Sequence, residues 1–225
     1  MSEPEIIIAR RESTGDRRAK IARAARELIV EKGVEGLRTR DIAERVGINV
    51  ATLHYHVPSK EALIELVADS LHQQFRQQTI DRPRAHLSAE AQMDLEFVDF
   101  REIALEKPEA MLVFSELMER ARRDDRIAAA ILPMKRKWRQ LLIDMLTEGV
   151  RDGAYRPDMD ADACATILMS SMIGFCRSRL KDPGAYERLV AELQRAIRNP
   201  DRETARPNRA EKRGDRNTQR LSRSK

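Results

Sequence analysis

The sequence has little of what sheets, disulfide scaffolds and membrane spans require. Only 4% of its 225 residues are aromatic, and it contains nine glycines, nine prolines and two cysteines. Alternating apolar and polar runs joined by Asn-Gly turns are absent, so the pattern disfavours a β-sheet. The first residues hold a run of only three isoleucines, too short for a signal peptide or a membrane span. With 35% charged and 41% apolar residues, the chain is typical of an all-α protein of the cytoplasm.

Residues that carry most enzyme and metal chemistry are few and unsuitably spaced. Cys164 and Cys176 fall in one helical stretch, where small buried hydrophobic side chains are their ordinary role. His56, His72 and His86 have no Cys, Asp or Glu at a metal-binding spacing and are typical of surface histidines. No glycine-rich phosphate loop and no Ser/His/Asp arrangement occurs. The sequence therefore predicts no catalytic site, no metal and no cofactor.

Positive charge is concentrated at the C-terminal end of the chain. Residues 1–61 hold 12 basic and 10 acidic side chains, residues 62–198 hold 21 and 23, and residues 199–225 hold 9 and 4. The net charge of +5 therefore belongs largely to a tail rather than to a compact part of the chain. A basic balance alone is weak support for nucleic-acid binding, so such a function must rest on a motif.

A helix-turn-helix pattern occupies residues 38–63, RTRDIAERVGINVATLHYHVPSKEAL. Gly47 stands where the first helix must end and the chain must turn, and glycine tolerates the left-handed backbone of such a turn. Asn49 can cap the second helix, and Ser59 can cap a third. The apolar positions of the first helix share one face: Ile42, Ala43 and Val46. So short a pair needs partner helices, and its use is to present the second helix to the major groove of DNA.

The same residues closely resemble the N-terminal motif of the TetR family of bacterial transcription regulators. The chain departs from the family pattern in three places: Asn49 replaces serine and keeps its capping chemistry, His54 replaces tyrosine, and Val57 replaces phenylalanine. The tyrosine of this chain in the second motif helix, Tyr55, lies one position after the first tyrosine of the family pattern. The matching positions are Thr39, Ile42, Ala43, Gly47, Thr52, Leu53, Tyr55, Ser59, Lys60, Glu61 and Leu63. The resemblance implies sequence-specific binding to double-stranded DNA.

Candidate DNA contacts lie on both motif helices and at the start of the next one. Thr39 suits a phosphate through its hydroxyl and the free N–H groups of its helix end, or it is a plain N-cap. Arg40 is suited to a guanine or a phosphate, or is solvated. Val50 and Ala51 suit thymine methyl groups, or are merely tolerated at the surface. The predicted recognition helix presents Asn49, Val50, Ala51, Thr52, His54 and Tyr55; His54, Tyr55 and Lys60 are expected to bind phosphates.

The remaining pattern predicts a second, larger helical domain. We expect a flexible arm over 1–15, the DNA-binding unit over 16–61, a ligand-binding and dimerisation domain over 62–198, and a basic disordered tail over 199–225. Predicted helices span 16–32, 39–46, 49–55, 59–79, 88–106, 126–152, 160–180 and 184–198, and another starts at Pro108. Pro133 either kinks its helix or opens a second one.

Large apolar side chains of the C-terminal half predict a ligand cavity, with ordinary core packing as the alternative for each. Methionine adapts to irregular gaps, and ligand pockets are concave and mostly apolar. The candidates are Phe97, Phe100, Phe114, Met118, Trp138, Met145, Met169, Met172 and Phe175. One tryptophan and three tyrosines give poor support for an aromatic cage around a quaternary ammonium ligand. Basic residues beside Trp138 form either a solvated face or an anion site: Lys135, Arg136, Lys137 and Arg139.

An uncharged helical stretch, residues 163–176, indicates a second subunit. A helix that is apolar on every side must be covered on every side, which one small bundle achieves with difficulty. Ser170 and Gly174 would allow another helix to approach closely. A last helix adds Tyr186, Leu189, Val190, Leu193 and Ile197. These two helices, and more loosely the region 108–180, resemble the C-terminal half of TetR regulators, which implies a four-helix dimer interface.

Together these patterns predict a homodimeric repressor that binds a palindromic operator and is released by a small, largely apolar ligand. The two recognition helices are then expected about one DNA turn apart, roughly 34–36 Å. Two alternatives remain. One is a DNA-binding regulator without a small-molecule effector, and the other is an all-α enzyme or carrier without DNA binding. The pattern contains no membrane segment.

Overall fold

The protein, a computed structural model, is described over residues 13–178 and 182–204. Within these ranges the regular structure is helical, apart from one isolated bridge between Tyr155 and Arg198, which confirms the all-α prediction. The elements are α1 (Thr14–Lys32), α2 (Thr39–Val46), α3 (Val50–His56), α4 (Lys60–Asp81), α5 (Ala89–Arg101), the π-helix η1 (Glu102–Glu106), α6 (Glu109–Arg120), α7 (Asp125–Arg151), α8 (Ala161–Arg177), α9 (Pro183–Ile197) and α10 (Pro200–Thr204). None of the described helices is both long and apolar enough to cross a membrane.

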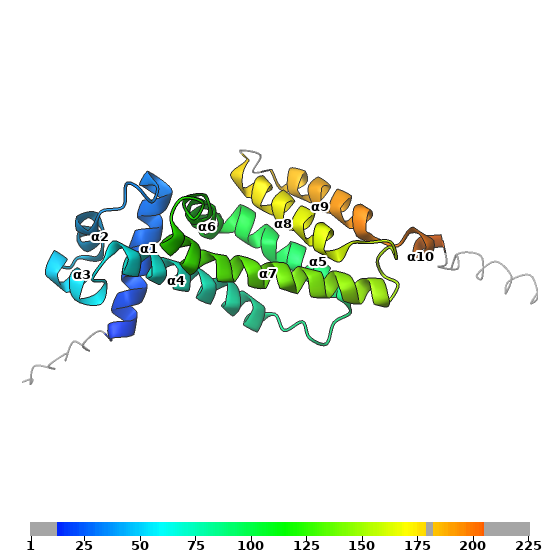
Figure 1. The fold of residues 1–225 in the computed structure, drawn as a ribbon, viewed down its shortest axis with the longest axis horizontal. Coiled ribbons are helices and arrows are strands. Elements are labelled where there is room, and N and C mark those ends of the chain that lie inside the picture. The colour runs from blue at the N-terminus through cyan, green and yellow to red at the C-terminus, as the bar shows by residue number, and fades with distance from the viewer. Residues whose placement is uncertain (1–12, 179–181, 205–225) are drawn as a thin grey trace, which may run out of the picture.

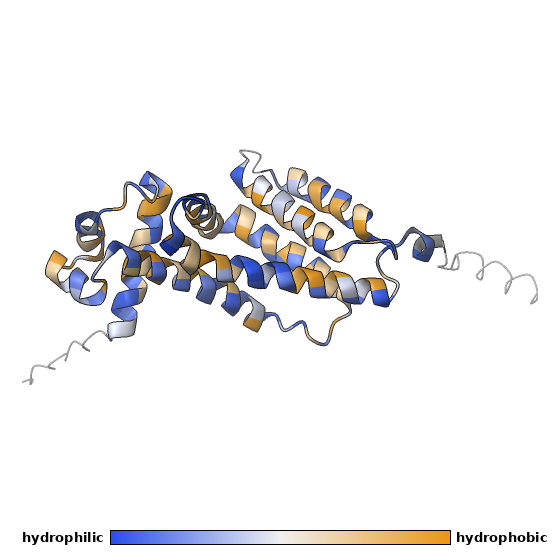
Figure 2. Ribbon diagram, viewed as in Figure 1, coloured by the Kyte–Doolittle hydropathy of each residue, from blue (hydrophilic) through white to orange (hydrophobic). Residues whose placement is uncertain are grey.

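The helices form an elongated molecule with the α1–α3 unit at one end (Figure 1). Helix α4 leaves this unit and runs beside α7, while α8 and α9 lie together on the far side of α5 and α7. Apolar and polar residues alternate around most helices (Figure 2), as amphipathic helices that share a core require. The buried apolar side chains form one contiguous cluster from α1 to α9, so the small unit and the larger bundle share a core.

Polar caps explain where most helices begin. The side chain of Asn49 accepts a bond from the Thr52 N–H at 2.7 Å, and that of Ser59 accepts one from Ala62 at 3.1 Å. Ser13, Ser88, Asp124, Asp160 and Asp182 cap α1, α5, α7, α8 and α9 in the same way. Gly47 adopts the left-handed conformation, with φ 74°, at the end of α2. The turn and cap chemistry of the motif therefore follows the sequence.

Several predicted boundaries are refined by the structure. Of the two alternatives for Pro133, a second helix is excluded, because Pro133 lies inside the single helix α7. The predicted helix 88–106 ends as α5 at Arg101 and continues as η1. Helix α1 begins at Thr14, inside the predicted arm, and Pro200–Thr204 of the predicted disordered tail is helical. Residues 1–12 of the arm and 205–225 of the tail lie outside the described residues.

Three of the residues predicted to contact a second subunit are buried within the protomer. Tyr186 is only 2% exposed, and its hydroxyl donates to the backbone oxygen of Phe97 at 2.6 Å. Leu193 and Ile197 are also buried. These side chains fix α9 to its own bundle, so the prediction that they face a second subunit is wrong. Of the same set, Ser170 and Gly174 are exposed, and Leu189 and Val190 are half-buried.

Candidate DNA-binding surface and ligand cavity

Helix α3 presents a polar outer surface and keeps one anchor in the core. Leu53 is 1% exposed, whereas Tyr55 is 82% exposed and Val50 is 37% exposed. A tyrosine this exposed leaves its apolar ring in water unless a binding partner covers it. The predicted contacts Asn49, Ala51 and His54 are exposed as well, and Thr52 is half-buried. The helix therefore offers an accessible face about two turns long.

Polar contacts hold α2 and α3 against α1. The guanidinium of Arg18 donates to the backbone oxygen of His56 at 2.8 Å, which secures the last turn of α3. Arg45 of α2 donates two bonds to Glu31 of α1, at 2.8 and 3.0 Å. These bonds hold the pKa of the Glu31 carboxyl below its usual value. The orientation of α3 is therefore fixed by α1 before any ligand or DNA arrives.

The N-terminal end of α2 and the start of α4 are suited to phosphate. Helix α2 has no side-chain cap, because its N-cap residue, Arg38, carries only hydrogen-bond donors, which it directs to the backbone oxygens of Glu35 and Leu37. Its first N–H groups, at Thr39 and Arg40, therefore point outward with the positive end of the helix dipole. Among the described residues, Arg40 and Lys60 are exposed and form no ion pair. Each can neutralise a phosphate without first breaking a salt bridge.

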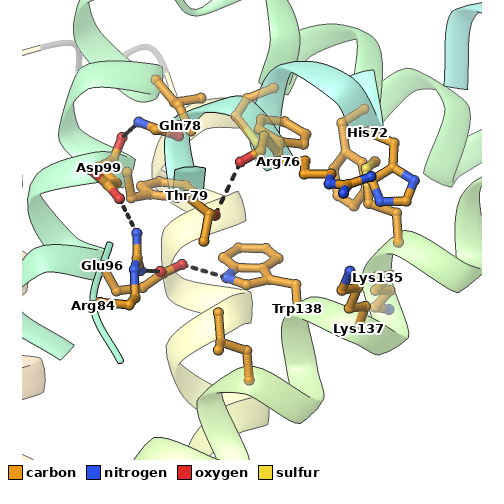
Figure 3. Close-up of a pocket in the computed structure, with 17 residues that line it drawn as sticks. His72, Arg76, Gln78, Thr79, Arg84, Glu96, Asp99, Lys135, Lys137 and Trp138 are labelled. Atoms are coloured by element: carbon orange, nitrogen blue, oxygen red, sulfur yellow. Dashed lines mark hydrogen bonds and ion pairs between the residues drawn. The ribbon is translucent and has the colours of Figure 1, made fainter. Parts of the chain in front are cut away.

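A cavity of about 250 Å³ lies between α4, α5, α6 and α7. Its walls are mostly apolar: Phe75, Phe100, Ile103, Met111, Phe114, Met134, Trp138 and Leu141. The rings of Phe100 and Trp138 are stacked, with centroids 5.9 Å apart and planes 10° apart. Basic side chains also line the cavity, from α4 and from α7: His72, Arg76, Lys135 and Lys137 (Figure 3).

One wall of the cavity carries a buried ionic cluster. Arg84 donates to Glu96 at 2.7 Å and also to Asp99; Arg84 and Asp99 are buried, and the Glu96 side chain is 12% exposed. The indole N–H of Trp138 donates to the other oxygen of Glu96 at 2.8 Å (Figure 3). Burial raises the pKa of the Glu96 carboxyl, and Arg84 and Trp138 oppose that rise. Buried charges of this kind are tolerated because each has a hydrogen-bonded partner.

Helices α1, α4 and α6 are joined near the boundary between the two parts of the molecule. Arg26 of α1 donates to Ser70 and Gln74 of α4, at 3.2 and 2.7 Å, and pairs with Glu109 of α6 at 2.9 Å. The Glu116 carboxylate of α6 accepts from the Val34 N–H. Helix α4 therefore bonds α1 through Ser70 and Gln74, and the neighbouring residues His72 and Phe75 line the cavity.

Comparison with known proteins gives the family. Residues 21–67 match the family of bacterial regulatory proteins, tetR family, and residues 104–199 match the BetI-type transcriptional repressor C-terminal domain. The HTH-type transcriptional repressor KstR2 of Mycolicibacterium smegmatis is 30% identical over 149 residues, which are 65% of this chain and 71% of the relative. The chain belongs to the TetR family. It is therefore a DNA-binding transcriptional regulator and not an enzyme.

Solved TetR-type structures share the fold. A transcriptional regulator from Saccharomonospora viridis, solved with choline, is 22% identical and covers 82% of this chain and 98% of its own, with a TM-score of 0.68. The regulator AibR, solved with isovaleryl coenzyme A and operator DNA, is 20% identical and covers 82% of this chain and 99% of its own, with a TM-score of 0.67. The two bound ligands have opposite charge, so this TetR-type fold accommodates ligands of either sign.

The cavity only partly matches the predicted residues. Phe100, Phe114 and Trp138 line it. The other candidates do not line this cavity: Phe97, Met145, Met169, Met172 and Phe175 are buried in the core, and Met118 packs against it. Packing alone accounts for them, so their assignment to the cavity is wrong. The ionic wall was missed, although the sequence contains its signal. Glu96 and Asp99 interrupt the apolar face of the same helix, beside Met93, Phe97 and Phe100.

Proposed function

We propose that this TetR-family regulator represses transcription as a homodimer that binds a palindromic operator and leaves it when a small ligand binds. The observation that carries the proposal is the accessible, rigidly held face of α3, with an unpaired cation and an uncapped helix end beside it. The relative KstR2 is named a repressor, which supports this direction of control. We place the protein in the cytoplasm, where it meets bacterial DNA.

The proposed DNA contacts are those of the motif. Phosphates, which fix the register on the duplex, are bound by Thr39, Thr52, His54, Tyr55 and Lys60, and Arg40 binds a guanine or a phosphate. Asn49, Val50 and Ala51 face the base edges in the major groove. In this arrangement Asn49 has two roles, because its oxygen caps α3 while its amide N–H groups stay available to a base.

The proposed dimer forms through the outer face of α8. Ile167 is 56% exposed there, and the neighbouring positions on the same face, Ala163, Ser170 and Gly174, are small and exposed. Beyond the adjacent residues and backbone of α8 itself, no atom of the described residues lies within 4 Å of a Cβ placed at Gly174. An uncharged face of small residues permits close approach of a second α8, and burial of Ile167 would contribute to association.

The proposed ligand occupies the cavity between α4 and α7. A ligand releases DNA only if it binds better to a conformer whose recognition helices are wrongly spaced. Helix α4 can transmit such a preference because it lines the cavity and also bonds Arg26 of α1. The alternative, a regulator without an effector, is disfavoured by the presence of an open, apolar cavity in this position.

Selection of bound sequences from random double-stranded DNA tests the function directly. We expect a palindromic consensus whose half-sites lie about one helical turn apart, because a two-fold symmetric dimer reads the same sequence twice. Enrichment of a single, non-repeated half-site would contradict the dimer. Salt-sensitive retention without any consensus would contradict sequence-specific binding.

The contact assignment is tested with the double variant Tyr55→Phe and Lys60→Ala. We expect its operator affinity to fall at least about tenfold, since it loses one hydroxyl bond and one charge at the phosphates. Arg136→Ala, an exposed cation of α7, is the matched control and should bind as the parent does. Both proteins should elute as the parent does in gel filtration. An unchanged operator affinity of the double variant would refute the assignment.

A further inference from the structure

We propose that the effector is an amphipathic anion, with an apolar acyl body inside the cavity and an anionic head at its basic opening. The inference rests on the proposed function, because it names the ligand class of the same cavity. It follows from two observations: the charged groups inside the cavity are paired, and the cations at its opening are not.

The interior of the cavity has no uncompensated charge. Both oxygens of Glu96 accept bonds, one from Arg84 and one from Trp138. Asp99 accepts bonds from Arg84 and from Arg82. Each buried carboxylate therefore has a guanidinium partner, and a ligand group placed among the aromatic side chains meets no free charge. An apolar group is favoured there, since it loses no hydrogen bonds on leaving water.

The opening, by contrast, carries cations without partners. Arg76 projects from α4, and Lys135 and Lys137 project from α7 (Figure 3). Among the described residues none of these three forms an ion pair or a side-chain hydrogen bond. The carboxylates that line the cavity, Glu96 and Asp99, are already paired with Arg84 and Arg82. His72 lines the same side. Like charges gathered from two helices repel one another, and an anion at their centre removes that repulsion.

The size of the cavity determines which part of the ligand it can hold: the acyl chain fits inside, and a large polar head group does not. Its volume of about 250 Å³ is below the roughly 300–1,000 Å³ of pockets that enclose a whole drug-sized ligand. It holds roughly eight groups of the size of a water molecule, which matches a medium acyl chain. A large polar head cannot enter, so it must lie at the opening beside the basic side chains.

A quaternary ammonium ligand fits this site poorly. Such a cation binds over open aromatic faces, and a carboxylate without a partner would attract it further. Here Phe100 stacks on one face of Trp138, and both carboxylate oxygens of Glu96 already accept hydrogen bonds, from Arg84 and from Trp138. The three cations at the opening would also repel it. Of the two interpretations of the basic residues beside Trp138, the structure favours an anion site for Lys135 and Lys137. Arg136 is exposed and does not line the cavity.

Trp138 is the only tryptophan of the chain, so its fluorescence reports on the cavity without any label. The full-length protein, free of DNA, is titrated with octanoyl-coenzyme A, octanoate, octanol, coenzyme A alone and choline. We expect the Trp138 fluorescence to change saturably with octanoyl-coenzyme A and with octanoate, and also with octanol but at lower affinity. Coenzyme A alone and choline should cause no change. A thioester that binds more tightly than octanoate identifies a phosphate-bearing head. Octanoate that binds more tightly than the thioester identifies the carboxylate itself. Choline that saturates, or octanol that binds as tightly as both anions, would overturn the proposal.

Removal of the cations tests their role. The triple variant Arg76→Gln, Lys135→Gln and Lys137→Gln should lose about tenfold or more in affinity for the better-bound anion. Its affinity for octanol should stay unchanged, which shows that the cavity is intact. Arg136→Gln is the matched control on the same helix. Equal affinity of the triple variant and the parent for the anion would refute the basic opening.

Operator binding is measured separately on the same preparations. A protein that binds the anion but keeps its operator leaves the ligand class standing and contradicts ligand-induced release. A protein that selects an operator but binds neither anion contradicts the ligand class alone.

Discussion

At the scale of single residues, the inner wall of the cavity depends on Arg84. Its guanidinium is the shared partner of Asp99, which is buried with it, and of Glu96, whose side chain is 12% exposed. A buried ion pair adds little net stability compared with apolar packing, yet removal of one partner is costly because the other charge stays behind without compensation. Removal of Arg84 leaves Glu96 without an ionic partner, whereas Asp99 keeps its pair with Arg82.

We expect Arg84→Met to lower the free energy of unfolding by about 3–5 kcal/mol at neutral pH. Urea denaturation followed by circular dichroism measures the change. Arg101→Met is the control, because the Arg101–Glu106 pair is half-exposed and spans 3.5 Å, and surface pairs contribute about 0–1 kcal/mol. Equal effects of the two substitutions would show that the cluster does not stabilise the fold.

The same variant should respond to acid in a defined direction. Burial already raises the pKa of Glu96 above its ordinary value in the parent, and loss of Arg84 raises it further. Between the unfolded and the folded pKa the native state binds more protons, so stability from this group increases as pH falls. We therefore expect the stability gap between parent and Arg84→Met to narrow on acidification from neutral pH. A gap that stays constant or widens would contradict a protonatable Glu96.

At the scale of elements, the end of α7 is held by a close approach between Gly149 and Tyr155. A side chain at Gly149 would overlap the ring of Tyr155, which is 2% exposed and donates from its hydroxyl to the backbone oxygen of Ala89 at 3.3 Å. Burial raises the pKa of this hydroxyl above its ordinary value. The turn after α7 is thus built around a ring that only glycine can accommodate.

Gly149→Ala should therefore destabilise the protein by about 1–3 kcal/mol through overpacking. The helical preference of alanine over glycine, up to about 1 kcal/mol, works in the opposite direction and reduces the observed loss. The midpoint of thermal unfolding measures the result. Gly184→Ala, at the start of α9, is the control, since its new side chain would meet only ends of flexible side chains at 3.4 Å or more. An equal or higher midpoint for Gly149→Ala would mean that Tyr155 moves aside without cost.

Local chemistry decided which elements the sequence could predict. Gly47, Asn49 and Ser59 act through turns and caps that involve only a few neighbouring residues, so the motif was predicted with its contacts. The cavity was predicted only in part, because it exists where four helices leave space unfilled. Whether a residue such as Met145 fills the core or faces the cavity depends on packing across helices, which periodicity along one helix cannot show.

At the scale of the whole molecule, α1 joins the DNA-binding end to the larger bundle. Its Arg26 bonds α4 and α6, and a carboxylate of α6, Glu116, accepts from the backbone just after α1. The apolar cluster is continuous across the same boundary. An effector that displaces α4 or α6 therefore acts on a set of bonds that already reaches the recognition helix through Arg18, rather than on two independent domains joined by a linker.

A shared core predicts a single unfolding transition. Trp138 lies in the larger bundle, so its fluorescence follows that part, while circular dichroism follows all helices. We expect the two signals to give the same urea midpoint at one fixed protein concentration, because loss of α1–α3 exposes apolar residues of α4 and α6. Arg26→Met should lower that midpoint and keep the two signals coincident, since the apolar contacts persist. Arg23→Met, a substitution of an exposed residue on the same helix, should leave the midpoint unchanged. A loss of helicity that precedes the fluorescence change in the parent would show that the DNA-binding end unfolds by itself, and the coupling between cavity and operator would then require another route than the core.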